Sequence, residues 1–155
     1  MAGRVKIGWT VAALLLAGIL SAREELPRPQ FKYAAGTESL SQGCQGNLEI
    51  GVDGLTFKCL GGSVSAPYAS ISLMQYRSDV SNKVRKMKVK WTIRPDYVTP
   101  LLGGKRNRFF TVVFRAGGAT HVMVLRVQPE AMRPYLAEID LKAQRRVEVE
   151  SYEEY

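Results

Sequence analysis

The amino-acid sequence predicts one mainly β domain, an α+β arrangement in which about seven antiparallel strands precede a C-terminal helix. Between Gly46 and Val127, apolar and polar residues alternate with a period of two, and glycine-containing turns interrupt the alternation. After Val127 the apolar residues recur with the period of an amphipathic helix. The chain has 155 residues, of which 46% are hydrophobic and 23% charged, as expected for a single globular core.

Residues 1–22 are typical of a targeting segment. Arg4 and Lys6 precede an apolar run of 14 residues at 7–20, shorter than most membrane-spanning helices and typical of a signal peptide. Cleavage after Ala22 would produce an exported protein, periplasmic or secreted. Without cleavage, residues 7–22 would anchor the protein in the membrane. Both alternatives stay open, and both carry the rest of the chain across a membrane.

Composition divides the rest of the chain into three parts. Two prolines and several charged residues predict a linker and lead-in at residues 23–43. The periodic pattern predicts a domain at residues 44–146. Residues 147–155 are acidic, and we expect this tail to fray.

The strongest hairpin signal lies at the beginning of the domain. Residues 47–52 alternate between polar and apolar, and residues 55–59 alternate in the same way on the return. The dipeptide Asp53-Gly54 is predicted to form a two-residue turn between them. Ideal pairing across that turn places Cys59 opposite Leu48.

Five further strands are predicted, at residues 63–66, 70–77, 84–93, 108–115 and 120–127. The strand at 84–93 has apolar residues on one face (Met87, Val89, Trp91, Ile93) and lysines on the other (Lys86, Lys88, Lys90). Residues 95–106 contain two prolines and two adjacent glycines, so they are predicted to be a loop.

The C-terminal helix is predicted from one apolar stripe, formed by Met132, Leu136, Ile139 and Ala143. Pro129 suits the first turn of a helix. Pro134 lacks an N–H donor and its ring clashes one turn back, so we expect a short turn at 129–133 and the main helix at 134–146.

The order of seven strands and one helix resembles the pleckstrin-homology-like superfold. The stretches that resemble its bacterial and GRAM-type members are residues 46–50, 54–57 and 66–71. Cys44, Gly46, Leu48 and Phe57 also resemble a pattern in uncharacterised exported bacterial proteins. The resemblance covers residues 44–146. It implies two near-orthogonal sheets closed by the helix, and a binding scaffold rather than an enzyme.

The same resemblance does not carry over phosphoinositide recognition. In the members that bind phosphoinositides, the ligating lysines and arginines lie in a long loop between the first two strands. Here that loop is the dipeptide Asp53-Gly54, which is short and acidic. The resemblance therefore implies a scaffold without a named ligand.

Residues 83–126 carry 11 lysines and arginines against one acidic residue, Asp96. The candidate anion-binding residues are Lys86, Lys88, Lys90, Lys105, Arg106 and Arg108. If the strands at 84–93 and 108–115 pair, these side chains could form one basic surface for lipid headgroups or another polyanion. The alternative is a solvated sheet face whose lysines prevent edge aggregation.

Cys44 and Cys59 are predicted either to form a disulfide in an oxidising compartment, or to be a free and a core cysteine, respectively. His121, the only histidine, is expected opposite Phe114 as a packed residue. The chain shows no catalytic motif, no metal-ligand set and no cofactor motif. A small enzyme of unrecognised type stays an alternative and would need a pocket around His121.

The partner is expected to be an unknown protein or an anionic membrane surface, and no small-molecule cofactor is implied. Nucleic acid is not expected, because no aromatic side chains stand beside the lysines to stack on bases. The sequence therefore predicts a noncatalytic binding module of the bacterial cell envelope, with a membrane-anchored protein that binds anionic lipid as the alternative.

Overall fold

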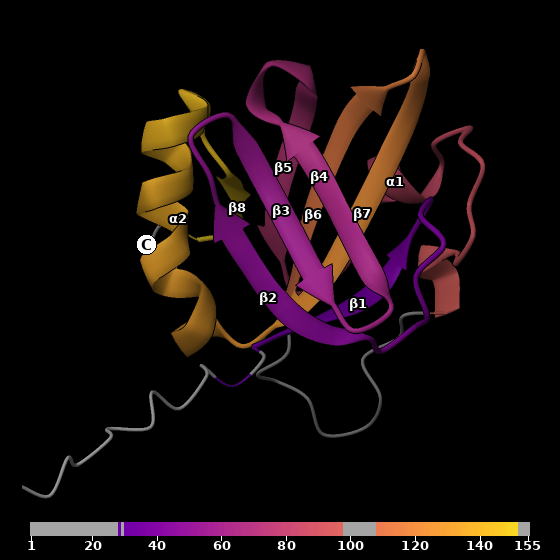
Figure 1. The fold of residues 1–155 in the computed structure, drawn as a ribbon, viewed down its shortest axis with the longest axis horizontal. Coiled ribbons are helices and arrows are strands. Elements are labelled where there is room, and N and C mark those ends of the chain that lie inside the picture. Colours follow the sequence, from indigo (N-terminus) through magenta and orange to yellow (C-terminus); the bar gives the residue numbers. More distant parts are fainter. Residues whose placement is uncertain (1–27, 29, 98–107, 152–155) are drawn as a thin grey trace, which may run out of the picture.

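The computed structural model describes residue 28, residues 30–97 and residues 108–151. The expected signal peptide or anchor lies outside them. In the described part of the chain, eight strands form one sheet in the order β4-β3-β2-β1-β7-β6-β5-β8, and a long helix, α2, follows β7 (Figure 1). The predicted mainly β fold with a C-terminal helix is confirmed. The strands form one continuous curled sheet rather than two separate sheets.

The bounds of the elements are as follows. The strands are β1 (Phe31–Gly36), β2 (Gln45–Ile50), β3 (Gly54–Cys59), β4 (Gly62–Pro67), β5 (Ile71–Arg77), β6 (Arg108–Ala116), β7 (Ala119–Val127) and β8 (Glu148–Val149). The helices are α1 (Asn82–Arg85) and α2 (Pro129–Ala143), and short 3₁₀ turns span Tyr68–Ser70 and Pro95–Tyr97.

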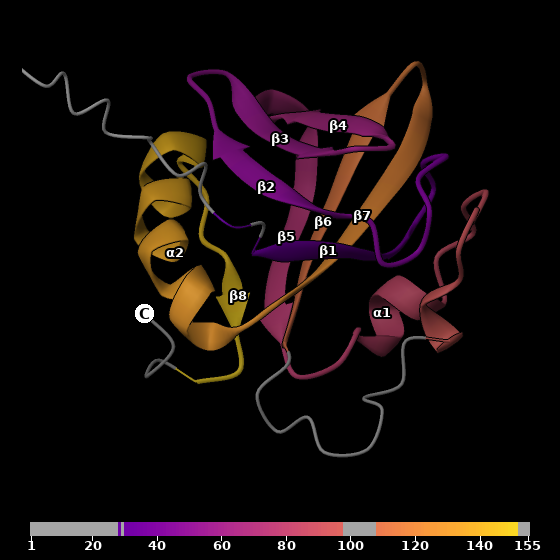
Figure 2. The ribbon, with the colours of Figure 1, turned by 60° about the horizontal axis from the view of Figure 1, so that its bottom comes forward.

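The main core lies inside the curl of the sheet. β2, β3 and β4 cross over β5, β6 and β7, as Figures 1 and 2 show. Apolar side chains of both halves fill the space between them, among them Phe57 of β3 and Phe110 of β6. α2 closes the core with Met132, Leu136 and Ile139, all fully buried, so the predicted apolar stripe is confirmed.

β1 lies in the centre of the sheet, although the sequence pattern predicts that its residues belong to the lead-in at 23–43. It pairs with β2 on one side and with β7 on the other. Phe31 and Tyr33 lie in the main core, whereas Ala34 and Ala35 belong to a second apolar cluster on the opposite face of the sheet. A strand buried on both faces shows no polar alternation, which is why the period-two pattern missed it.

The predicted hairpin between β2 and β3 is present, but its turn lies one residue earlier than expected. The register of the two strands leaves Val52 and Asp53 in the turn, rather than Asp53 and Gly54. Tyr68 holds this turn in place: its backbone N–H donates to the carbonyl oxygen of Asp53, and its hydroxyl donates to that of Gly51, both at 2.9 Å. The strands predicted at 63–66, 70–77, 108–115 and 120–127 correspond to β4, β5, β6 and β7.

The strand predicted at residues 84–93 is wrong. Residues 82–85 form α1, whose N-terminus is capped by the Ser81 hydroxyl accepting from the Val84 N–H. The following residues form an irregular segment with bends at Val89 and Thr92, and it joins the sheet only through a bridge between Gly36 and Ile93. They cannot pair with β6, the strand at 108–116, because β5 and β7 already occupy both of its edges. The segment instead covers the second apolar cluster with alternate side chains.

α2 is one continuous helix, so the expected break before Pro134 is wrong. Pro134 lies on the exposed side of the helix, where its ring meets solvent instead of the sheet. Pro134 also lies close to the start of the helix. The hydrogen bond that is missing, because proline has no N–H, is the one to the carbonyl oxygen of Glu130 in the first turn.

The expected fraying of residues 147–155 is also wrong for the part described. Val147 is buried in the main core, and β8 pairs in parallel with β5, with Glu148 opposite Gln75. The Gln75 amide donates to the Glu148 carboxylate at 2.7 Å. Acidic side chains here serve as hydrogen-bond acceptors for the sheet edge, a role that charge composition alone does not reveal.

Candidate anion-binding surfaces

Three of the predicted basic residues form a strip along the irregular segment after α1. Lys86, Lys88 and Lys90 are exposed, while the apolar side chains between and after them pack on the sheet. The predicted alternation is therefore correct, although the segment is no strand. Within the described residues, none of the three ammonium groups makes an ion pair. We call these residues the lysine strip.

Hydrogen bonds fix the backbone of the lysine strip. The Trp91 indole N–H donates to the Met87 carbonyl oxygen at 3.4 Å, and the Thr92 hydroxyl donates to the Thr37 carbonyl oxygen at 3.0 Å. Gly36 and Ile93 exchange backbone hydrogen bonds at 3.0 and 3.1 Å. The three lysines thus project from a segment tied down by both its backbone and its apolar side chains.

Arg108, by contrast, is engaged in an ion pair at another place. Its guanidinium donates to the Glu150 carboxylate at 2.8 Å, and Glu150 also accepts from the N–H and hydroxyl of Ser78. Burial acts to raise the pKa of Glu150, but the hydrogen bonds of Ser78, the charge of Arg77 and the Arg108 bond outweigh it and lower that pKa. Arg108 therefore helps to hold β8 on the sheet.

The predicted single basic surface is not formed by the described residues. Arg108 pairs with Val127 at one end of β7, whereas Lys88 and Lys90 lie beside His121 near its other end. At about 3.3 Å per residue, that separation along the strand is ~20 Å. Lys105 and Arg106 lie outside the described residues.

Lys88 and Lys90 border a hollow of about 550 Å³, which we call the Lys88 hollow. Its other lining residues are Thr37, Ser39, Val89, Trp91, Thr92, Ala119, Thr120 and His121. The hollow combines two ammonium groups with several hydroxyl groups, which suits an anionic ligand group.

His121 lies opposite Phe114 in the β6–β7 ladder, as predicted, and its ring stacks on that phenyl ring at 5.4 Å. Its Nδ1 lies 2.5 Å from a carboxylate oxygen of Glu38, and its Nε2 lies 3.1 Å from the carbonyl oxygen of Ala116. Both ring nitrogens are therefore engaged within the protein. Through its contact with Glu38, His121 links β7 to the loop after β1.

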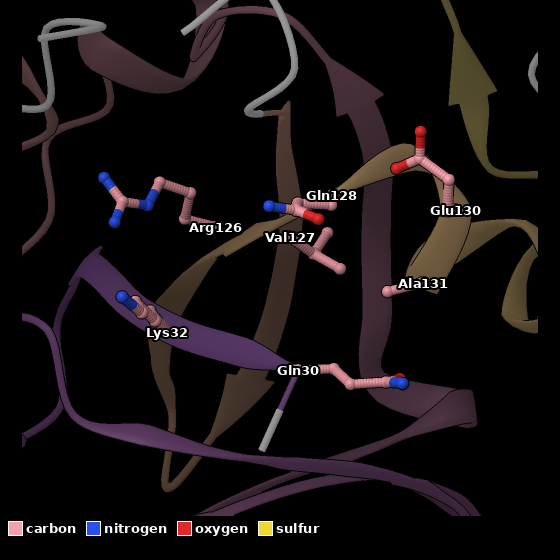
Figure 3. A pocket seen from close by; sticks show the side chains of 7 residues that line it. All are labelled: Gln30, Lys32, Arg126, Val127, Gln128, Glu130 and Ala131. Carbon is pink, nitrogen blue, oxygen red and sulfur yellow. The ribbon is translucent and has the colours of Figure 1, made fainter. Parts of the chain in front are cut away.

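A second hollow, of about 670 Å³, lies where β1, β7 and the start of α2 meet (Figure 3). Its lining residues are Gln30, Lys32, Arg126, Val127, Gln128, Glu130 and Ala131. Figure 3 shows Lys32 and Arg126 together at one side, Glu130 at the other and Gln128 between them. We call it the Lys32–Arg126 hollow.

Sequence reasoning missed the Lys32–Arg126 hollow because it assigned Lys32 to the lead-in. In the sequence, Arg126 is only one of the 11 lysines and arginines of residues 83–126. Recognition of residues 31–36 as the neighbour of β7 would have placed the two side chains together.

The structure joins Cys44 and Cys59 by a disulfide, with Cα atoms 6.0 Å apart. The earlier turn makes this geometry possible. In the observed register Cys59 lies opposite Gly46, not opposite Leu48, which brings it within reach of a cysteine two residues before Gly46.

No protein-family model matches the chain, and no curated protein is significantly similar to it. Across residues 28, 30–97 and 108–151, no helix is long and apolar enough to span a membrane, and no group of three or more His, Cys, Asp or Glu side chains could hold a metal ion. The candidate binding features of the described residues are the two hollows and the lysine strip.

Proposed function

We propose that the protein is a noncatalytic binding domain whose lysine strip contacts an anionic membrane surface. The observation that carries the proposal is the exposure of Lys86, Lys88 and Lys90 on an ordered segment, without acidic partners among the described residues. Lysines near an anionic leaflet contribute about 1 kcal/mol each. Because the segment is already ordered, little conformational entropy is lost on binding.

A location outside the cytoplasm forms part of the same proposal. The Cys44–Cys59 disulfide supports it, because such bonds persist in oxidising compartments. The basic and apolar pattern of residues 1–22 supports export, with or without cleavage. N-terminal sequencing of the protein from separated membrane and soluble fractions would decide between a free and an anchored form.

A pleckstrin-homology-like assignment is a further part of the proposal. Its support is the arrangement of β1 to β7, which pair antiparallel in a curled sheet, with α2 closing the core. The short turn between β2 and β3 offers no basic loop of the kind that binds phosphoinositides. The lysine strip between β5 and β6 is therefore the basic segment that we assign to membrane contact.

The enzyme alternative has weaker support. The Lys88 hollow does supply a concavity beside His121, but both imidazole nitrogens are bonded within the protein. We therefore assign the hollow to binding rather than to proton transfer.

Sedimentation with vesicles tests the proposed function. The purified full chain is mixed with vesicles of phosphatidylcholine alone or with added phosphatidylglycerol. We expect binding to the anionic vesicles only, weakening as salt rises. The triple variant Lys86→Gln, Lys88→Gln, Lys90→Gln should lose about two orders of magnitude in affinity.

The matched control removes the same charge elsewhere, by Lys58→Gln on β3, Arg133→Gln in the first half of α2 and Arg146→Gln after the end of α2. All three side chains are exposed. The control should bind anionic vesicles nearly as the unchanged protein does. Equal binding to neutral and anionic vesicles, or equal losses in the two triple variants, would refute the role of the lysine strip.

A further inference from the structure

Lys32 and Arg126 are directly opposite each other in the β1–β7 ladder. Opposite residues of an antiparallel pair project from the same face of the sheet, with Cβ atoms about 5 Å apart. Two positive charges in this position repel each other and destabilise the ladder. A central pair of strands thus carries an unfavourable charge arrangement.

Nothing in the described part of the chain neutralises this pair. Neither side chain makes an ion pair or a hydrogen bond there. On its other side, Arg126 faces Phe109 of β6, which is apolar and buried. Both cations are half-buried, so solvent screens their repulsion less than it would on an open surface.

The space beside the pair is large enough for a small ligand. The Lys32–Arg126 hollow measures about 670 Å³, within the usual range of ligand pockets. The amide side chains of Gln30 and Gln128 supply further donors and acceptors along it. Glu130 places a carboxylate at the side away from the two cations (Figure 3).

We propose that this hollow binds a phosphate monoester, with the phosphoryl group between Lys32 and Arg126. A phosphate monoester carries a charge of about −1.5 to −2 at neutral pH, which matches two cations better than a carboxylate does. The arginine guanidinium can donate two parallel hydrogen bonds to such a group, and the lysine adds a point charge.

Glu130 sets the selectivity at the other end of the ligand. Its carboxylate repels a second anionic group and attracts an ammonium group. The ligand class that satisfies both ends is an aminoalkyl phosphate. This site is separate from the lysine strip and does not depend on the proposed membrane contact.

Thermal unfolding of the purified full chain in phosphate-free, low-salt buffer tests the site. The probes are O-phosphoethanolamine, glycerol 3-phosphate and inorganic phosphate. We expect O-phosphoethanolamine to raise Tm by ~4 °C at ten times its Kd, with smaller effects of the other two. The double variant Lys32→Gln, Arg126→Gln should lose this rise.

If Lys32 and Arg126 had only a structural role, their replacement would lower the Tm of the ligand-free protein. Without ligand, the double variant should have a Tm equal to or above that of the unchanged protein, because the repulsion is gone. The control Lys83→Gln, Arg133→Gln removes the same charges at exposed positions and should keep the ligand effect. The lysine-strip variant should keep it too, which separates this site from the proposed function.

Three results would overturn the proposal. One is a Tm that no phosphate monoester raises. Another is a double variant that still responds as the unchanged protein does. The third concerns the source of the phosphate. If the protein binds phosphatidylethanolamine vesicles through Lys32 and Arg126 but does not respond to O-phosphoethanolamine, the site belongs to a lipid headgroup. For selectivity, Glu130→Gln should reduce the preference for O-phosphoethanolamine over glycerol 3-phosphate.

Discussion

Gly46 lies directly opposite Cys59 in the β2–β3 ladder, and the absence of a side chain at Gly46 lets the backbone of β3 approach closely. A Cβ atom at Gly46 would collide with the carbonyl oxygen of Lys58 and would lie 2.9 Å from the Cβ of Cys59. The glycine is required here by close packing of backbone against backbone, since its φ is not in the left-handed region.

Gly46→Ala is therefore expected to destabilise the fold by about 1–3 kcal/mol, because the backbone of β3 must move to admit the methyl group. Urea unfolding measures the change. Gly61→Ala is the matched control, since a Cβ there meets only the Cys44 sulfur at an ordinary 3.6 Å. Similar stabilities of the two variants would contradict the packing argument.

Replacement of both cysteines by serine, Cys44→Ser with Cys59→Ser, should lower the free energy of unfolding by about 3 kcal/mol, as expected for a closed loop of about 15 residues. Reduction of the disulfide in the unchanged protein should lower Tm by about as much as the two substitutions do. Mass spectrometry after alkylation checks the bond directly. Two alkylated cysteines in the untreated protein would show that the disulfide is absent.

Leu136→Ala should cost about 2–5 kcal/mol, because Leu136 is fully buried between α2 and the sheet. Leu141→Ala makes the same chemical change on the same helix, at a side chain that is 78% exposed, and should change stability by less than about 0.5 kcal/mol. Urea unfolding of both variants tests which face of α2 packs on the core, and equal losses would contradict it.

Glu150 should make the stability of the fold depend on pH. Its pKa is lowered from 4.5 in the folded protein, mainly through Ser78 and the two arginines, against the opposing effect of burial. The ionised carboxylate therefore stabilises the folded state above pH 4.5, and this contribution is lost as pH falls through the folded pKa. Glu150→Gln should cost less than about 1 kcal/mol at pH 7, given its exposure.

The measurement is urea unfolding from pH 7 to pH 3. The difference between Glu150→Gln and the unchanged protein should narrow below pH 4.5. Glu49→Gln is the charge-matched control, because its carboxylate contacts one exposed lysine, Lys58, at 2.7 Å. A difference that stays constant across this range would exclude the proposed role of the carboxylate charge.

The sequence was sufficient for elements with one buried face. Leu48 and Phe57 alternate with polar residues, because β2 and β3 each turn one side toward the main core. β1 has no such contrast, since Phe31 and Ala34 are buried on opposite faces. Periodicity reports the difference between two faces, and it is silent where both are covered.

The lysine strip shows a different limit. Alternation of Met87 and Val89 with lysines predicted the correct exposure of each side chain, but not membership of the sheet. An irregular segment packed on a sheet can show the same alternation of exposed and covered side chains as a strand paired within it. Which of them forms depends on free hydrogen-bonding edges, and that is a property of the whole topology. The Lys32–Arg126 hollow could not be predicted either, because Lys32 and Arg126 meet only through the pairing of β1 with β7.

The position of β1 has a consequence for the order in which the chain can fold. β1 lies between β2, which follows it directly in the sequence, and β7, which comes much later in the sequence, after β6. Phe31 pairs with Gly46 of β2 and with Val127 of β7. During synthesis, β1 to β4 can associate early, yet the second edge of β1 stays unpaired until β7 has emerged. Such distant pairing slows folding and leaves an exposed strand edge in the meantime. The centre of the sheet thus closes only after β7 has emerged, and the free edge of β1 can associate with other chains until then.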